Sequence, residues 1–145
     1  MTATTPAAFD PKPRNLGTVL TMKAGAAILA GQAVVCPGTG EDWQVIPCDS
    51  DTALTLPFVG VALNSQATTG GDVTVASVGS VLLVCEGSGN AVDEGDHLMA
   101  SAAAGCVITG TDAADATFLG VAVTDGAANG TFYALIQPQY AAKGA

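Results

Sequence analysis

The side chains best suited to chemistry lie in one short segment, Asp93-Glu94-Gly95-Asp96-His97. Carboxylates beside an imidazole could hold a hard cation or carry out general acid–base catalysis. The segment lacks the alternating acids and closing glutamate of a calcium loop. A parallel segment has Ala30-Gly31-Gln32 where this one has Glu94-Gly95-Asp96, so the glycine turn has a structural reason. We therefore interpret the segment as a solvated turn rather than a metal or catalytic site.

The other candidates for metal binding or nucleophilic catalysis are one histidine, His97, and four cysteines: Cys36, Cys48, Cys85 and Cys106. No CxxC pair exists, so a zinc cage would need all four thiolates, or three of them with His97. A catalytic triad would need the same histidine, and the chain has no GxSxG motif. Sparse cysteines are typical of small buried hydrophobes in a reducing compartment, although an even count leaves disulfides open. We expect no enzyme activity, no metal and no cofactor.

Two glycine-rich segments and one tryptophan are further candidates for ligand binding. Pro37-Gly-Thr-Gly40 and Glu86-Gly-Ser-Gly89 lack the lysine of a phosphate loop and precede no helix, which favours hairpin loops. Trp43 is either an exposed anchor for a sugar or a partner, or a half-buried tryptophan on a strand, and the second is favoured. Aromatic residues make up 5 % of the chain, too few for a platform on which single-stranded nucleic acid stacks.

The elements that position these residues are predicted to be strands. Short runs rich in Val, Thr and Leu alternate with clusters of Gly, Asp and Asn, and no stretch has the period of a long amphipathic helix. The alanine-rich patches 102–104 and 113–116 are expected to form at most a helical turn. Strands are predicted at residues 16–22, 32–36, 43–47, 58–63, 72–76, 80–85, 97–100, 106–109, 118–123 and 131–137.

An internal repeat organises these strands. Residues 28–34 parallel 92–98 around a glycine turn, and residues 58–63 parallel 118–123 around a glycine inside a strand. Such glycines serve positive φ angles or close backbone approach. The structural glycines predicted in this way are Gly31, Gly60 and Gly71 in the first copy and Gly95, Gly120 and Gly130 in the second. The repeat predicts two copies of one β unit, at about residues 24–85 and 90–137, that face each other across a shared core.

The composition sets limits on stability and partners. The chain has 145 residues, of which 18 are Gly and 27 are Ala, and these bury little area each at roughly 25 cal/mol per Å². A marginal monomer is expected, so oligomerisation is a natural remedy. The net charge of −9 argues against nucleic acid and anionic membranes. The sequence has neither a secretory signal nor an apolar run of about 18 residues, so a soluble cytoplasmic product is expected.

The first 15 residues differ from the rest of the chain. They contain Pro6, Pro11 and Pro13 and no apolar periodicity, which predicts an extended arm because proline denies the backbone a donor. Lys12 and Arg14 are two of the four cations in the chain. We expect an arm at 1–15, a single β domain at 16–138 and a short tail at 139–145.

Five motifs occur in an order that resembles small capsid decoration (cement) proteins of tailed double-stranded DNA phages. They are KAGAAILAGQAVV, FVGVAL, TTGGDVTVASVGSV, GNAVDEGDHLMA and FLGVAVTDGAANGTFYALI, within about residues 16–137. The resemblance implies an all-β protein, a compact β-sandwich or β-barrel of β-tulip type, on the outside of an icosahedral head. Such proteins reinforce joints between major capsid subunits, commonly as homotrimers. The expected location is the exterior of the virion's capsid, after assembly in the host cytoplasm.

The arm matches the capsid-gripping arm of lambda-type decoration proteins by position and character. The residues assigned to it are Thr4, Thr5, Pro6, Phe9, Pro11, Lys12, Pro13 and Arg14. Three other classes remain open from the residues alone. A carbohydrate-binding or adhesin-like surface module would need exposed aromatics beyond Trp43, Tyr133 and Tyr140. An enzyme would need a partner for His97 or the acids of residues 93–96 in a pocket, and a subunit of a cellular shell or a tail would have a different symmetry.

Overall fold

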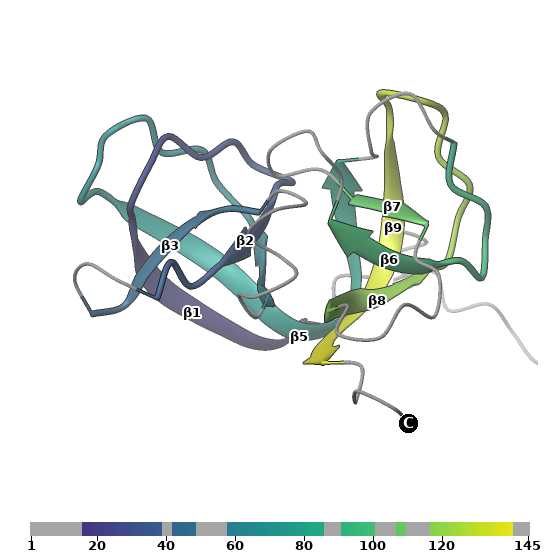
Figure 1. Cartoon of the computed structure of the whole chain (residues 1–145), viewed down its shortest axis with the longest axis horizontal. Helices are drawn as coiled ribbons and strands as arrows, with labels where there is room; N and C mark the ends of the chain where they lie inside the picture. Colours follow the sequence, from purple (N-terminus) through teal and green to yellow (C-terminus); the bar gives the residue numbers. More distant parts are fainter. Residues whose placement is uncertain are drawn as a thin grey trace, which may run out of the picture.

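The computed structural model describes residues 16–38, 42–48, 58–85, 91–100, 107–109 and 117–140 (Figure 1). Every regular element within these ranges is a β-strand, which confirms the predicted all-β class. The strands are β1 (Leu16–Ala24), β2 (Ala33–Val35), β3 (Gln44–Pro47), β4 (Phe58–Ala62), β5 (Asp72–Cys85), β6 (His97–Ala100), β7 (Val107–Thr109), β8 (Thr117–Ala122) and β9 (Thr131–Tyr140). In this part of the chain there is no helix long and apolar enough to span a membrane.

The largest departure from the predicted strands is β5, which is one strand where the sequence predicts two, at 72–76 and 80–85. Its first half pairs with β1 and β4, and its second half pairs with β9. Gly79 lies buried near the change of partner, and the ladder with β9 shifts register just after it. The glycine therefore marks an irregularity within a continuous strand rather than its end (Figure 1).

Five strands close into a barrel. The sheet order begins β1-β3-β2-β4-β5, and β1 also pairs with β5, which closes the ring. The β1–β3 pair is parallel and the other pairs are antiparallel. The first unit is therefore a β-barrel, which is one of the two architectures that the sequence predicts. Its interior is filled by buried apolar side chains: Met22, Ala24, Ile28, Val34, Val45, Ala62, Val73 and Val75.

The remaining strands form a second unit beside the barrel. From the second half of β5 the sheet continues through β9, β8, β6 and β7 (Figure 1). A second core joins this unit to the outer wall of the barrel. From the barrel it includes Ala33, Val35, Phe58, Val61 and Ala76, and from the second unit it includes Val92, Leu98, Leu119, Ala122, Phe132, Ala134 and Ile136. The second unit thus covers one side of the barrel.

The segments that the sequence predicts to be repeated make matching backbone hydrogen bonds in the two units. In each copy the glycine-turn N–H donates to the end of a strand, and a bridge ties the turn to the following loop. The matching pairs are Gly31 to Ala62 and Gly95 to Ala122, each at 2.8 Å, and the bridges Ile28–Gln66 and Val92–Gly126. The two units therefore share this pattern of turn and strand contacts, and only the first closes into a barrel among the described strands.

The predicted arm at 1–15 and the alanine-rich patches at 102–104 and 113–116 lie outside the described residues. At the other end of the chain, β9 continues to Tyr140, two residues into the segment that the sequence assigns to the tail.

Candidate functional site

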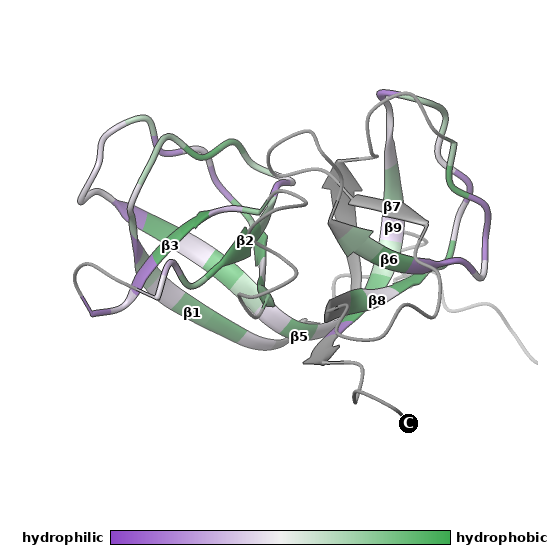
Figure 2. Ribbon diagram, in the orientation of Figure 1, coloured by the Kyte–Doolittle hydropathy of each residue, from purple (hydrophilic) through white to green (hydrophobic). Residues whose placement is uncertain are grey.

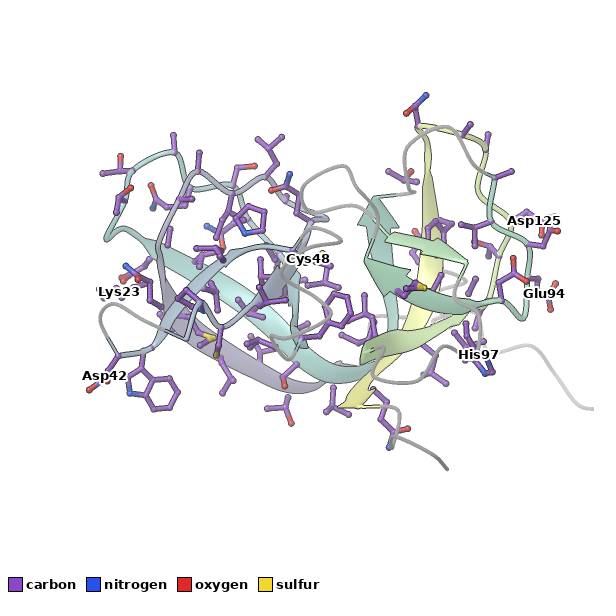
Figure 3. The ribbon with its side chains drawn as sticks, in the orientation of Figure 1. Lys23, Asp42, Cys48, Glu94, His97 and Asp125 are labelled. Atoms are coloured by element: carbon purple, nitrogen blue, oxygen red, sulfur yellow. The ribbon has the colours of Figure 1, made fainter. Side chains whose placement is uncertain are left out.

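The acidic turn of the second unit uses its carboxylates to hold its own backbone. Asp96 Oδ2 accepts the N–H of Asp93 at 2.9 Å, and Asp125 Oδ1 accepts the N–H of Glu94 at 2.8 Å. Glu94 and Asp125 lie together at the outer end of the unit (Figure 3). Within the described residues, His, Cys, Asp and Glu side chains form no group of three that could hold a metal ion. These carboxylates therefore accept backbone hydrogen bonds in a solvated turn.

The first unit makes the same two bonds with neutral side chains. Gln32 Oε1 accepts the N–H of Leu29 at 2.8 Å, and Ser65 Oγ accepts the N–H of Ala30 at 2.9 Å. The turn therefore needs an oxygen acceptor, and this acceptor does not have to be negatively charged. The hydrophilic colour in Figure 2 marks the turn of the second unit, whereas residues 28–30 of the first unit are apolar. The two equivalent turns consequently differ in charge.

Four of the predicted glycines occupy positions that no other residue fills easily. Gly31 and Gly95 have φ angles of 90° and 92°, in the left-handed region that favours glycine. Gly60 and Gly120 lie inside strands, where a Cβ atom would stand 1.9 Å and 2.1 Å from a carbonyl oxygen of the neighbouring strand. Gly60 and Gly120 therefore set how closely the neighbouring strands of each unit approach.

The third pair, Gly71 and Gly130, differs from the others. The residues with positive φ are the preceding ones, Gly70 at 88° and Asn129 at 62°. At Gly71 the constraint is space, because a Cβ atom would lie 2.4 Å from the side-chain Cδ of Gln66.

Trp43 is exposed, so the favoured interpretation of a half-buried strand tryptophan is wrong. Its relative exposure is 65 %, and it stands in the turn before β3, which begins at Gln44. Its φ of 62° is left-handed, which is rare for a bulky side chain. The Trp43 carbonyl accepts the N–H of Lys23 at 2.7 Å. Lys23 itself pairs with Asp72, directly opposite on β5.

The remaining candidates are distributed as follows. Cys48 is buried in the second core and Cys36 is half-buried, whereas the side chain of Cys85 and the whole of Cys106 lie outside the described residues. Tyr133 is half-buried, and the side chain of Tyr140 is also outside the described part. So are the eight arm residues from Thr4 to Arg14.

Sequence reasoning missed a set of exposed apolar side chains on the sheet. Val78 on β5 and Leu135 on β9 are 45 % and 47 % exposed, and Val19 on β1 and Val123, just after β8, are also exposed. The available signal was that β8, β9 and β5 beyond Asp72 contain no charged residue. In antiparallel sheets a face open to water normally carries polar side chains.

The described part of the chain is all-β, and its two units share a pattern of strand and turn contacts. The family model described as phage cement protein matches residues 13–137, which is 125 of the 145 residues. The chain belongs to the phage cement protein family. It is a structural protein of the phage capsid surface and not an enzyme, and the resemblance seen in the sequence is confirmed.

A solved structure with a similar fold is the N base of head fiber gp8.5 in bacteriophage phi29. The TM-score is 0.60 and the identity 17 %, and the match covers 83 % of this chain and 93 % of that chain. At this identity the likeness concerns the fold alone. No curated protein matches the sequence.

Proposed function

We propose that this chain decorates the outside of a phage head as a homotrimer and stabilises the head by binding the major capsid protein. The family match over residues 13–137 carries the proposal. The composition supports the trimer. Alanine and glycine account for 45 of the 145 residues, so a single chain buries little area, and a closed assembly stabilises it by covering apolar surface.

The likeness to the phi29 protein supports the placement on the head. That protein is described as the base of a head fiber, and it shares its fold with most of this chain. A fold shared with the base of a head fiber suits a protein that attaches to a head from outside.

In this proposal the arm, residues 1–15, makes the contact with the capsid. Its three prolines exclude it from the interior of a sheet, and an extended backbone is suited to pairing with the edge of an exposed strand. Lys12 and Arg14 place two of the four cations of an acidic chain in this short segment. These cations favour a capsid surface that carries acidic groups and increase the rate of docking.

The test is binding of purified protein to heads that lack it, measured by co-sedimentation and by cryo-EM of the particles. Deletion of residues 2–15 should leave the domain folded and abolish or strongly weaken binding. The double variant Lys12→Ala/Arg14→Ala should show a smaller loss of affinity relative to the wild type, and added salt should shrink this difference, because exposed ion pairs contribute roughly 0.2–1 kcal/mol each and are screened by salt. Its matched control is Lys23→Ala/Lys143→Ala, which changes the net charge from −9 to −11 in the same way.

Two results would contradict the proposal. If the truncated protein binds heads as tightly as the full chain, the arm is dispensable and the β domain holds the capsid. If light scattering finds only the 14.2 kDa chain, and density on the particle shows isolated copies, the trimer is wrong. A trimer has three times this mass, about 43 kDa.

A further inference from the structure

The two β units differ in how much of their outer surface is covered. In the first unit, Ala33, Val61 and Ala76 form one row across β2, β4 and β5, since Ala33 pairs with Val61 and Val61 with Ala76. All three are fully buried and belong to the second core, together with residues of the second unit. Strand β4 also contacts β8 and β9 of that unit. The row is therefore buried by the second unit of the same chain.

The equivalent row of the second unit is His97, Val121 and Leu135. The register is the same, because His97 pairs with Val121 and Val121 with Leu135 across β6, β8 and β9. Here nothing in the described part of the chain covers the row to the same degree: His97 is exposed, Val121 is half-buried and Leu135 is 47 % exposed. In Figure 3 the His97 side chain points outward at the edge of the second unit. The row that is buried in the first unit thus has an exposed equivalent in the second unit.

This open row continues into a larger apolar surface. Val123 follows Val121 on the same side, and Val78 lies on the adjacent part of β5. Gly79 pairs with Ile136, which puts Val78 and Leu135 on a diagonal where side chains of neighbouring strands remain within reach. We call this surface the open face; its residues are Val78, His97, Val121, Val123 and Leu135.

The open face contains no carboxylate, which is unusual for a chain of net charge −9. Strands β8 and β9 carry no charged residue, and β5 carries none after Asp72. When two copies approach, any acidic surface opposes them by repulsion of like charges. Exposed apolar patches mark interaction sites, and this patch lets two copies meet without opposed carboxylates. The charge therefore favours a second copy of this chain as the occupant.

We propose that the open face is the surface through which copies of this chain contact one another. The inference rests on the proposed homotrimer and assigns its interface. In the first unit, the equivalent row is buried by a different surface and not by a copy of itself. A contact of that kind between chains is heterologous, and a heterologous contact that closes forms a ring such as a trimer. The row of the first unit, which the second unit of the same chain buries, is thus the model for burial of the open face by a neighbouring chain.

The test compares matched substitutions on and off the open face. Leu135→Asp and Leu135→Lys place either charge at the centre of the face. Leu29→Asp and Leu29→Lys are the controls, because Leu29 is 63 % exposed and lies in the turn of the first unit, where the second unit already has Asp93. We expect both Leu135 variants to raise the dissociation constant of the trimer at least about tenfold, and both Leu29 variants to leave it unchanged. Mass is followed by light scattering and folding by circular dichroism.

Each outcome separates the interface from the trimer. If the wild type is a trimer and both Leu135 variants assemble as tightly, the open face is not the interface although the trimer stands. If those variants stay trimeric but no longer bind heads, the capsid protein is the occupant and the inference is wrong. If the wild type is monomeric in solution and on heads, the trimer and the interface both fail. Leu135→Thr, which keeps a strand-favouring residue, serves if a charge prevents folding, and a folded variant with an unchanged dissociation constant overturns the inference.

Discussion

Substitution of either strand glycine by alanine is predicted to destabilise the protein severely. At Gly60 a Cβ atom would stand 1.9 Å from the Ala76 carbonyl oxygen and 2.9 Å from the Ser77 Cα. At Gly120 it would stand 2.1 Å from the Leu135 carbonyl oxygen. Ordinary contact begins at 3.4 Å, so the neighbouring strand must retreat by about 1.5 Å (3.4 − 1.9) at Gly60 and 1.3 Å (3.4 − 2.1) at Gly120. Both obstacles are backbone atoms, which cannot rotate away.

The expected loss in the free energy of unfolding follows from the hydrogen bonds that break when the neighbouring strand moves away. Beside Gly60, Val61 pairs with Ala76 and Ala62 with Val75, and a movement of this size stretches such ladder bonds beyond hydrogen-bonding distance. Two lost bonds at about 0.5–1.5 kcal/mol each, with overpacking at about 1–3 kcal/mol, give about 2–6 kcal/mol. The smaller backbone entropy of alanine in the unfolded chain returns about 0.4–1 kcal/mol. We expect Gly60→Ala and Gly120→Ala each to lower the free energy of unfolding by about 2–5 kcal/mol.

The assay is urea unfolding followed by circular dichroism, at one protein concentration because association stabilises the folded state. The matched control is Gly95→Ala, at a φ of 92° with no atom within 4 Å of the added carbon. This control should lose only the cost of left-handed backbone, about 1–2 kcal/mol. If Gly60→Ala and Gly120→Ala lose no more than Gly95→Ala, close strand approach does not explain these glycines.

Substitutions at three further residues test single features. Trp43→Gly should leave the melting temperature unchanged or raise it, because it relieves left-handed strain of roughly 1 kcal/mol under an exposed ring; a clear fall would mean that the ring packs against the domain. Lys23→Met should lower the free energy of unfolding by less than about 1 kcal/mol, because its ion pair with Asp72 is exposed, and added salt should shrink that difference. Asp125→Ala should lower it by about 0.5–1.5 kcal/mol by removing the acceptor for the Glu94 N–H, whereas Asp125→Ser, which installs the residue found at Ser65, should restore it. Equal losses in the two Asp125 variants would contradict the acceptor argument.

The sequence predicts the parts of this fold that local backbone geometry controls. A turn with a φ near 90° is open almost only to glycine, so the spacing of Gly31 and Gly95 is enough to mark equivalent turns. Gly60 and Gly120 are predictable in a similar way, since a glycine inside an apolar strand indicates close approach of a neighbouring backbone. The repeat is therefore visible in the sequence although the two copies share few side chains.

What the sequence does not predict depends on contacts between distant strands. The barrel closes because β1 pairs with β5 and, in parallel, with β3, and no residue pattern within β1 specifies those partners. The Ser77-Val78-Gly79 segment resembles a break, yet β5 runs through it because β9 takes over as partner beyond it. The prediction for Trp43 fails because its apolar ring favours burial, whereas its turn directs it to solvent.

The two copies show which parts of the unit are constrained and which can diverge. Backbone N–H groups in the turns need an oxygen acceptor, and Gln32 or Asp96 meets that need equally. The charge of the acceptor is free to change without loss of the bond. The second unit has acidic residues at such positions, where the first is neutral. The second unit therefore combines an acidic turn with the uncharged open face, whereas the equivalent turn of the first unit is neutral and its equivalent row is buried.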